Sequence, residues 1–258
     1  MYHGLWSDPN QLLGRSPAEV RYWIEAKVFE EQLCRLAALG YTAVTLADLP
    51  AYRTDAVAAK PIVLTFDDGW VSDWQIATPI LKRLGWKAEF FVTVGWVGKP
   101  GFLAWDDLRQ ALSAGMEIQS HSMTHPDLTQ LSREEIRTEL LTSKETLEER
   151  LGKSIAFFAL PGGSGRLSEV AQLARETGYV GVCTSEVRLN PLARLPFCLH
   201  RIPVVNTTTS SELEAWVQGR GLKALSWRRK TLRFVRRLCG AKLYEWTKAK
   251  LLQTPLTS

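Results

Sequence analysis

Short apolar runs alternate with amphipathic stretches along most of this chain. The apolar runs predict strands over 42–45, 61–66, 88–94, 116–119, 155–158, 179–183 and 200–205. Between most of them, apolar residues recur three or four positions apart and predict helices over 17–39, 74–84, 105–114, 132–151 and 167–177. Such regular alternation indicates βα units and a largely parallel sheet. About seven strands within roughly 200 residues favour a barrel over an open sheet.

The helix predicted over 132–151 carries the clearest boundary signals. Ser132 and Glu135 have the spacing of a capping box, and Gly152 follows the last apolar residue of the stretch. We find no internal repeat and no low-complexity segment in the sequence.

Composition narrows the class of protein further. The chain has 258 residues, of which 45% are hydrophobic and 23% charged, and these values exclude a disordered, collagen-like or coiled-coil protein. Its four cysteines contain no CxxC pair, so neither a disulfide framework nor a zinc finger is indicated. No apolar run approaches the roughly 18 residues that a membrane span needs, and no signal peptide is visible.

The net charge of +5 is unevenly distributed. Residues 220–250 hold eleven Lys or Arg and one acidic residue, whereas residues 1–219 hold 21 basic and 26 acidic residues. We therefore divide the chain into a domain over 1–219 and a basic amphipathic helical tail over 220–258. The tail is expected to contact an anionic membrane surface, or alternatively to pack its apolar stripe on the domain. No nucleic-acid-binding motif accompanies the charge, so no nucleic acid is expected as a partner.

Two clusters of chemically capable residues follow predicted strands. Asp67 and Asp68 directly follow the strand predicted over 61–66. Gly69 lets the backbone turn, so both carboxylates can reach the same opening at the end of the sheet. Adjacent carboxylates repel each other unless a bound cation or a proton neutralises part of their charge. Taken alone, however, this sequence is more typical of a solvated Asp-Asp-Gly turn.

His121 and His125 form the second cluster, after the strand over 116–119. A spacing of four places both imidazoles on one face of a single helical turn, an arrangement that chelates a divalent metal. The alternative is a pair of surface histidines, although the chain has four histidines in all. With one aspartate, the pair would supply three ligands and leave a position for water, and the second aspartate would act as general base.

A glycine-rich loop, 161–165, follows the strand over 155–158. It lacks the pattern of a phosphate-binding loop, but exposed N–H groups at Gly162 and Gly163 would suit a tetrahedral oxyanion. A purely structural turn is the alternative.

These motifs, in this order, resemble the polysaccharide deacetylases with a NodB homology domain, carbohydrate esterase family 4. The likeness rests on Thr65–Gly69, His121–His125 and Phe158–Gly163 and extends over about residues 1–205. It implies a distorted (β/α)7-type barrel that binds zinc, or else cobalt, nickel or manganese. It also implies that Asp67 is the general base, that Asp68, His121 and His125 are the metal ligands, and that the reaction removes N-acetyl groups from amino sugars.

The sequence departs from the family's commoner pattern at two places. The third motif usually carries an arginine where this chain has Ala159, which leaves the orienting partner of the base open. Arg201 is a candidate substitute and also a candidate substrate-binding residue. The late motif that supplies the general acid is also irregular, which leaves His3 and His200 as alternatives. His3 is a candidate because the Tyr2-His3 opening resembles those of exopolysaccharide-type deacetylases. We rank it first because the strand over 200–205 is expected to point His200 away from the active site. Trp70 is a candidate for stacking on a sugar ring.

We therefore expect a metal-dependent hydrolase that deacetylates GlcNAc- or GalNAc-type sugars of a bacterial polysaccharide or its precursor. Peptidoglycan or chitin oligosaccharides are the alternative substrates, and a catalytically impaired glycan-binding relative is the alternative from another class. We expect the protein to be cytoplasmic, with peripheral contact at the inner face of the membrane.

Overall fold

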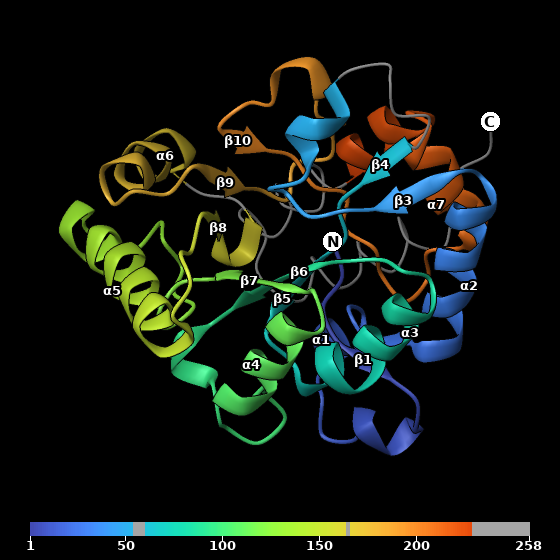
Figure 1. Ribbon diagram of the computed structural model, residues 1–258, viewed down its shortest axis with the longest axis horizontal. Helices are drawn as coiled ribbons and strands as arrows, with labels where there is room; N and C mark the ends of the chain where they lie inside the picture. Colours follow the sequence, from blue (N-terminus) through green and yellow to red (C-terminus); the bar gives the residue numbers. More distant parts are fainter. Residues whose placement is uncertain (54–59, 164–165, 229–258) are drawn as a thin grey trace.

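A curled six-stranded parallel sheet forms the centre of the computed structural model (Figure 1). The structure describes residues 1–53, 60–163 and 166–228. In spatial order the strands are β10 (Cys198–Leu199), β9 (Gly181–Cys183), β8 (Phe157–Ala159), β7 (Glu117–Ser120), β6 (Glu89–Val92) and β5 (Thr65–Asp68). Every neighbouring pair is parallel, which confirms the predicted βα organisation.

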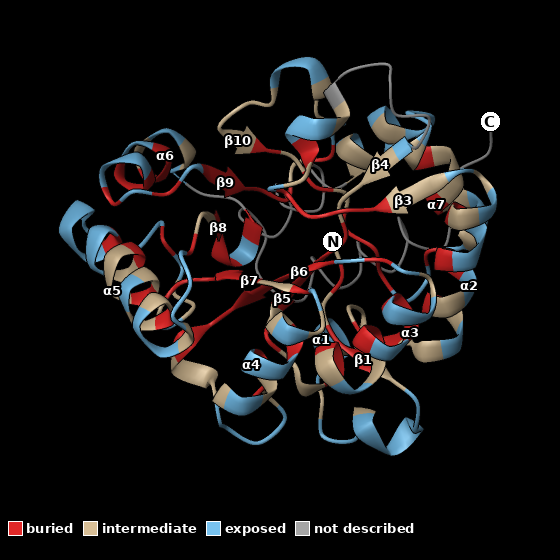
Figure 2. Ribbon diagram, viewed as in Figure 1, coloured by how far each residue is buried: buried red, intermediate tan, exposed pale blue. Residues whose placement is uncertain are grey.

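Helices surround this sheet, with their outward faces exposed and the strands buried inside (Figure 2). They are α2 (Ala26–Ala38), α3 (Thr78–Arg83), α4 (Trp105–Ser113), α5 (Arg133–Leu151), α6 (Leu167–Glu176) and α7 (Ser210–Val217), together with the short α1 (Pro17–Val20). Two small parallel pairs complete the strands: β1 (Leu5–Trp6) with β2 (Ile24–Glu25), and β3 (Tyr41–Ala43) with β4 (Lys60–Ile62).

Successive strand residues serve two different hydrophobic clusters. Phe90, Phe158 and Val182 belong to the large cluster that also contains apolar residues of the surrounding helices. Their neighbours Phe91 and Ala159 belong to a second, smaller cluster with residues of the β3–β4 connection. Side chains alternate across a strand, so the first cluster fills the space under the helices and the second fills the inside of the curled sheet.

The first residues of the chain join the two ends of the curled sheet. The Tyr2 N–H donates to the Thr65 carbonyl at 2.7 Å, and the Asp67 N–H donates to the Tyr2 carbonyl at 3.1 Å. On the other side, the Val204 N–H donates to the Met1 carbonyl at 2.9 Å. Met1 and Tyr2 thus lie between β5 and the segment that follows β10, and the expected distorted (β/α) barrel is confirmed.

Three element predictions are wrong in detail. Residues 200–205 form no strand, and the last strand, β10, precedes them. The helix expected over 17–39 is divided into α1 and α2, with β2 between them, because Ile24 and Glu25 pair in parallel with β1. The strand expected over 61–66 is likewise two strands in different sheets, β4 and β5. Apolar periodicity alone cannot show where pairing partners change.

The basic tail lies largely outside the described residues. Leu222 and Leu225 pack against the large hydrophobic cluster, while residues 229–258 are not described. The predicted domain boundary at 219 and the predicted membrane contact of the tail therefore stay predictions. Among the described helices, none is long and apolar enough to cross a membrane.

Candidate metal and catalytic centre

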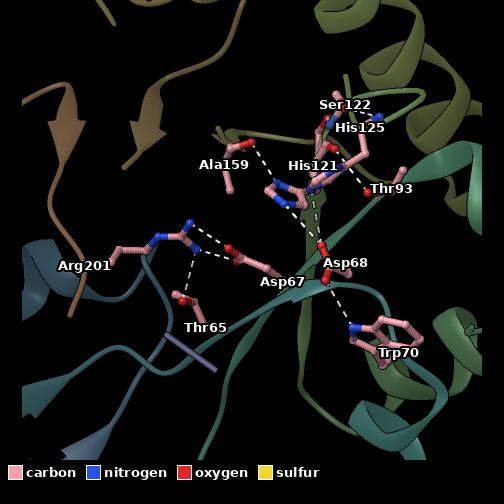
Figure 3. Close-up of polar contacts among 11 residues, drawn as sticks. Thr65, Asp67, Asp68, Trp70, Thr93, His121, Ser122, His125, Ala159 and Arg201 are labelled. Carbon is pink, nitrogen blue, oxygen red and sulfur yellow. Dashed lines mark hydrogen bonds and ion pairs between the residues drawn. The ribbon is translucent and has the colours of Figure 1, made fainter. Parts of the chain in front are cut away.

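The carboxyl end of β5 carries the two adjacent aspartates. Asp68 and Gly69 both adopt the left-handed backbone conformation, with φ of 80° and 84°. For a non-glycine residue this conformation costs on the order of 1–3 kcal/mol and persists only where the surrounding structure enforces it. The turn begins at Asp68 itself, which places its carboxylate near that of Asp67 instead of on the opposite face of the strand (Figure 3).

Asp67 is buried and held by Arg201 in a two-pronged ion pair. The guanidinium Nη1 and Nη2 donate to Asp67 Oδ1 and Oδ2 at 2.6 and 2.8 Å. Arg201 also donates to Thr65 Oγ1 and to the Thr184 carbonyl, so it is fixed from three sides. Burial opposes ionisation of Asp67, but the charge of Arg201 and the hydrogen bonds from its guanidinium hold the pKa of Asp67 below the ordinary value.

This ion pair bears on both roles considered for Arg201. The buried guanidinium lies on Asp67, as the role of orienting the base requires, and it is not available as the substrate contact that was also considered. The contact also bears on Ala159, where the resemblance leads one to expect an arginine. Here the guanidinium comes from the segment after β10, 134 residues from Asp67 in the chain.

The segment between β7 and α5 brings both histidines to the same mouth. His121 to His125 contain no helical turn, which corrects the sequence-based expectation. Ser122 and His125 instead have φ of 70° and 60°, so the backbone folds back on itself and returns the second imidazole to the first. The His125 N–H donates to Ser122 Oγ at 2.9 Å, and the ring centroids of the two histidines are 4.9 Å apart.

The two imidazoles and Asp68 form a compact set of donors. The Nε2 atoms of His121 and His125 lie 3.5 and 3.6 Å from Asp68 Oδ1, and the three potential ligand atoms are all within 4.8 Å of one another. His121 Nδ1 lies 2.9 Å from the Ala159 carbonyl; donation of its proton there leaves Nε2 as the free lone pair. Burial lowers the pKa of His121 to about 3, which keeps the ring neutral.

This donor set fits a divalent ion. Burial raises the pKa of Asp68, and the negative charge of Asp67 raises it further. The Asp68 carboxylate therefore lacks a full counter-charge, which a bound cation would supply. Neutral imidazole and carboxylate are the ligands that zinc and related ions prefer. The residues that would hold the ion are those expected from the sequence: Asp68, His121 and His125.

Trp70 has a different contact from the one predicted. Its indole Nε1 donates to Asp68 Oδ2 at 3.1 Å, on the oxygen not facing the histidines. Phe102 stacks on the indole at 4.3 Å between centroids, and the Arg15 guanidinium lies 4.7 Å from its centre. Because both neighbours already contact the ring, this geometry favours Trp70 as a support for Asp68 over a sugar platform.

The structure places the two candidate acids differently. His3 follows Tyr2 beside the end of β5, and the charges that act on it are those of Asp68, Asp67 and Arg201. His200 instead lies near Thr184 and Glu186, with its Nδ1 at 3.5 Å from Thr184 Oγ1 and 3.9 Å from Glu186 Oε2. Burial lowers the pKa of His3 against the opposing effect of both aspartates. This placement favours His3 over His200 as the candidate general acid.

The glycine-rich loop offers one candidate N–H, not two. The Gly163 N–H donates to the Leu160 carbonyl at 2.8 Å, so it is not available to an oxyanion, and its predicted role is corrected. Gly163 is needed for space, because a Cβ there would lie 1.9 Å from Ser185 Oγ. The oxyanion role of Gly162 stays a prediction.

Sequence reasoning missed two residues that hold the histidine loop. The carboxylate of Glu139, on α5, accepts hydrogen bonds from the N–H groups of Met123 and Thr124 and from the Thr124 hydroxyl. Gly95 approaches from the other side, where its N–H donates to the Met123 carbonyl at 2.8 Å. A Cβ at Gly95 would lie 2.8 Å from that same oxygen.

Comparisons with known proteins agree with this centre. The family model for polysaccharide deacetylases matches residues 54–182, half of the chain and a range that includes all three candidate metal ligands. The Bacillus subtilis protein YxkH is 26% identical over 197 residues, which cover 76% of this chain and 70% of YxkH. The peptidoglycan-N-acetylglucosamine deacetylase PgdA of Listeria monocytogenes is 33% identical over 116 residues, which cover 43% of this chain but only 22% of PgdA.

Solved structures share the barrel. The Streptococcus pyogenes deacetylase PplD in complex with acetate superposes with a TM-score of 0.72 at 25% identity, covering 83% of this chain and 94% of PplD. IcaB from Ammonifex degensii superposes with a TM-score of 0.69 at 26% identity, covering 84% and 94%. The family model, the relatives and the shared barrel together show that this chain belongs to the polysaccharide deacetylases of carbohydrate esterase family 4, hydrolases of N-acetyl amide bonds.

Proposed function

We propose that this chain removes the acetyl group from N-acetylated amino sugars of a bacterial polysaccharide or its precursor and releases acetate. The observation that carries the proposal is the pairing of a complete ligand set, Asp68, His121 and His125, with a separately held carboxylate, Asp67. One carboxylate can thus bind a cation while the other remains free for proton transfer. A divalent ion bound by the three ligands would polarise the acetamide carbonyl and lower the pKa of water in the site.

Asp67 is suited to act as the general base on the attacking water. Arg201 fixes the direction of the carboxylate but leaves lone pairs on its oxygens, because a carboxylate offers about four acceptor sites. A low pKa makes Asp67 a weak base, which is sufficient where the water itself has become more acidic. The base accepts the proton as water adds to the carbonyl carbon.

Departure of the amine requires a proton, and we propose His3 as the residue that donates it. Its Nδ1 is buried without a hydrogen-bond partner among the described residues, beside the end of β5 that carries both aspartates. We expect His3→Ala to lower kcat by about 10²-fold, because general acid catalysis contributes 10²–10⁴-fold. His200→Ala, at a position that interacts with Glu186, is expected to change kcat less than threefold, a small effect by the same scale.

The measurement is kcat for acetate release by each variant, with bound metal quantified in parallel. Equal losses in the two variants, or normal turnover by the His3 variant with a full metal content, would exclude His3 as the acid.

The function itself is tested by acetate release from GlcNAc and GalNAc oligosaccharides, peptidoglycan fragments and chitin oligosaccharides. We expect acetate from at least one of them, loss of release after chelation, and recovery when zinc, cobalt, nickel or manganese is added back. The ion that restores the highest kcat/KM identifies the preferred metal. Absence of acetate from every N-acetylated glycan, with metal bound at the site, would contradict the proposal.

A further inference from the structure

An array of aromatic rings connects the metal ligands to a cation on the surface. We call it the aromatic arc, and it consists of His125, Trp96, Phe102, Trp70 and Trp23. Neighbouring ring centroids along this series are 5.0, 5.0, 4.3 and 5.0 Å apart. Since Trp70 also donates to Asp68, the arc is attached to the metal-ligand set at two points. None of its rings was linked to another by the sequence pattern.

Arg15 lies at the far end of the aromatic arc. Its guanidinium carbon is 3.6 Å from the centre of the Trp23 ring and 4.7 Å from that of Trp70. Gly14, with φ of 78°, turns the chain before it, and Nε donates to the Gln11 carbonyl at 3.0 Å. Stacking on two indoles and one backbone hydrogen bond therefore fix the guanidinium in one place.

The two terminal nitrogens of Arg15 remain available. Within the described part of the chain, no carboxylate lies within 4.0 Å of this guanidinium. Glu19, whose charge acts on Arg15, is occupied as the partner of the Ser16 N–H and hydroxyl in the capping box of α1. An arginine that is held in place while its N–H groups are free is preorganised to bind an anion such as a carboxylate or phosphate in a two-pronged contact.

We infer that Arg15 forms an anion-binding subsite and that the preferred substrate carries a carboxylate or phosphate on, or next to, the N-acetylated sugar. The inference rests on the proposed function and deepens it, because Trp70 alone separates Arg15 from the ligand Asp68. Phe102 stacks on the indole and the Arg15 guanidinium also lies over it, so we expect the substrate to contact the edge of the guanidinium instead of the Trp70 ring.

Three substrates separate this subsite from a merely structural stack. They are a neutral chitin disaccharide, the disaccharide of N-acetylglucosamine and N-acetylmuramic acid, which carries a carboxylate, and N-acetylglucosamine 1-phosphate. With the full-length chain we expect kcat/KM to be about tenfold higher for at least one anionic substrate, as one charge-assisted hydrogen-bond pair allows. The preferred substrate identifies the anion as carboxylate or phosphate. The preference should fall as salt concentration rises.

Arg15→Gln is expected to remove the preference for anionic substrates. It should raise KM for the anionic substrate about tenfold and change KM for the neutral disaccharide less than twofold. Arg15→Lys, which keeps the charge but not the fork, should retain part of the preference. Arg109→Gln removes a cation from the exposed Asp106–Arg109 pair on α4 and serves as the matched control. It should change KM for neither the anionic substrate nor the neutral disaccharide.

Equal losses for neutral and anionic substrates in Arg15→Gln, or equal kcat/KM values in the unmodified protein, would overturn the inference. Calorimetric binding of the same three compounds provides a readout that does not depend on turnover. If no compound releases acetate, the proposed function fails, yet an Arg15-dependent difference in Kd between anionic and neutral compounds would still support the subsite. The absence of that difference would refute it.

Discussion

Asp67→Asn is expected to lower kcat for acetate release by about 10³-fold while the protein retains its metal. General base catalysis contributes 10²–10⁴-fold, and asparagine matches the shape of aspartate but cannot accept the proton. The metal should remain because Asp68, His121 and His125 form the ligand set, whereas Asp67 faces Arg201. The measurement is single-turnover acetate release at saturating substrate, together with the metal content of each preparation.

The control for this variant is Asp106→Asn, which removes an exposed carboxylate that pairs with Arg109 on the surface of α4. It should leave kcat unchanged, since exposed ion pairs contribute little. Circular dichroism shows whether Asp67→Asn remains folded with Arg201 deprived of its partner. If the folded variant retained more than about a tenth of the activity, a loss far below that of a general base, Asp67 could not be the base.

Much of the scaffold around Asp67 was predictable because its signals are local. The capping box at Ser132 and Glu135 and the left-handed Gly152 mark the ends of α5 as expected. The alternation of β5, β6 and β7 with helices likewise follows from apolar runs that are buried on both faces of a parallel sheet. In contrast, the sequence gives no local sign that Ile24 and Glu25 leave a helical pattern to pair with β1.

The identity of the metal-ligand candidates was predictable, but their geometry was not. An Asp-Asp pair and a His pair that each follow a strand of the predicted parallel sheet point to one edge of that sheet. The left-handed conformations of Ser122 and His125, however, are uncommon for residues other than glycine, and no glycine marks these positions in the sequence. The loop is held by groups elsewhere, including the carboxylate of Glu139 and the carbonyl of Ala159. A backbone carbonyl leaves no trace in residue type, so no pattern could have shown this contact.

The pairing of Asp67 with Arg201 was beyond sequence reasoning for a different reason. The two residues are separated by most of the barrel in sequence, and they meet because Met1 and Tyr2 join β5 to the segment after β10. Arg201 was a candidate only because the resemblance left an arginine unaccounted for at Ala159. The structure supplies the contact, and its energetic importance is open to direct measurement.

Arg201→Gln is expected to reduce the free energy of unfolding by about 3–5 kcal/mol at pH 7, the usual cost of removing one partner of a buried ion pair. The side chains of Arg201 and Asp67 are 6% and 4% exposed, so solvent cannot replace the lost partner. The pKa of Asp67 is lower in the folded protein than in the unfolded chain, where an aspartate titrates near about 3.9. The stability that this ionised group contributes is therefore complete above about pH 4 and is lost as the pH falls further.

Two comparisons identify the ion pair as the cause. Urea unfolding at pH 7 and at successively lower pH should show the difference between Arg201→Gln and the unmodified protein shrinking as the pH falls. Asp67 of the folded variant, buried without its counter-charge, takes up a proton at a higher pH than Asp67 of the unmodified protein. The double variant Asp67→Asn/Arg201→Gln should be more stable at pH 7 than the sum of the single losses predicts, because neither charge is then left unpaired. Arg133→Gln, which breaks an exposed pair with Glu176, should change stability by less than about 1 kcal/mol. A loss below that same limit for Arg201→Gln, or a loss independent of pH, would show that the pair does not hold Asp67 in its ionised state.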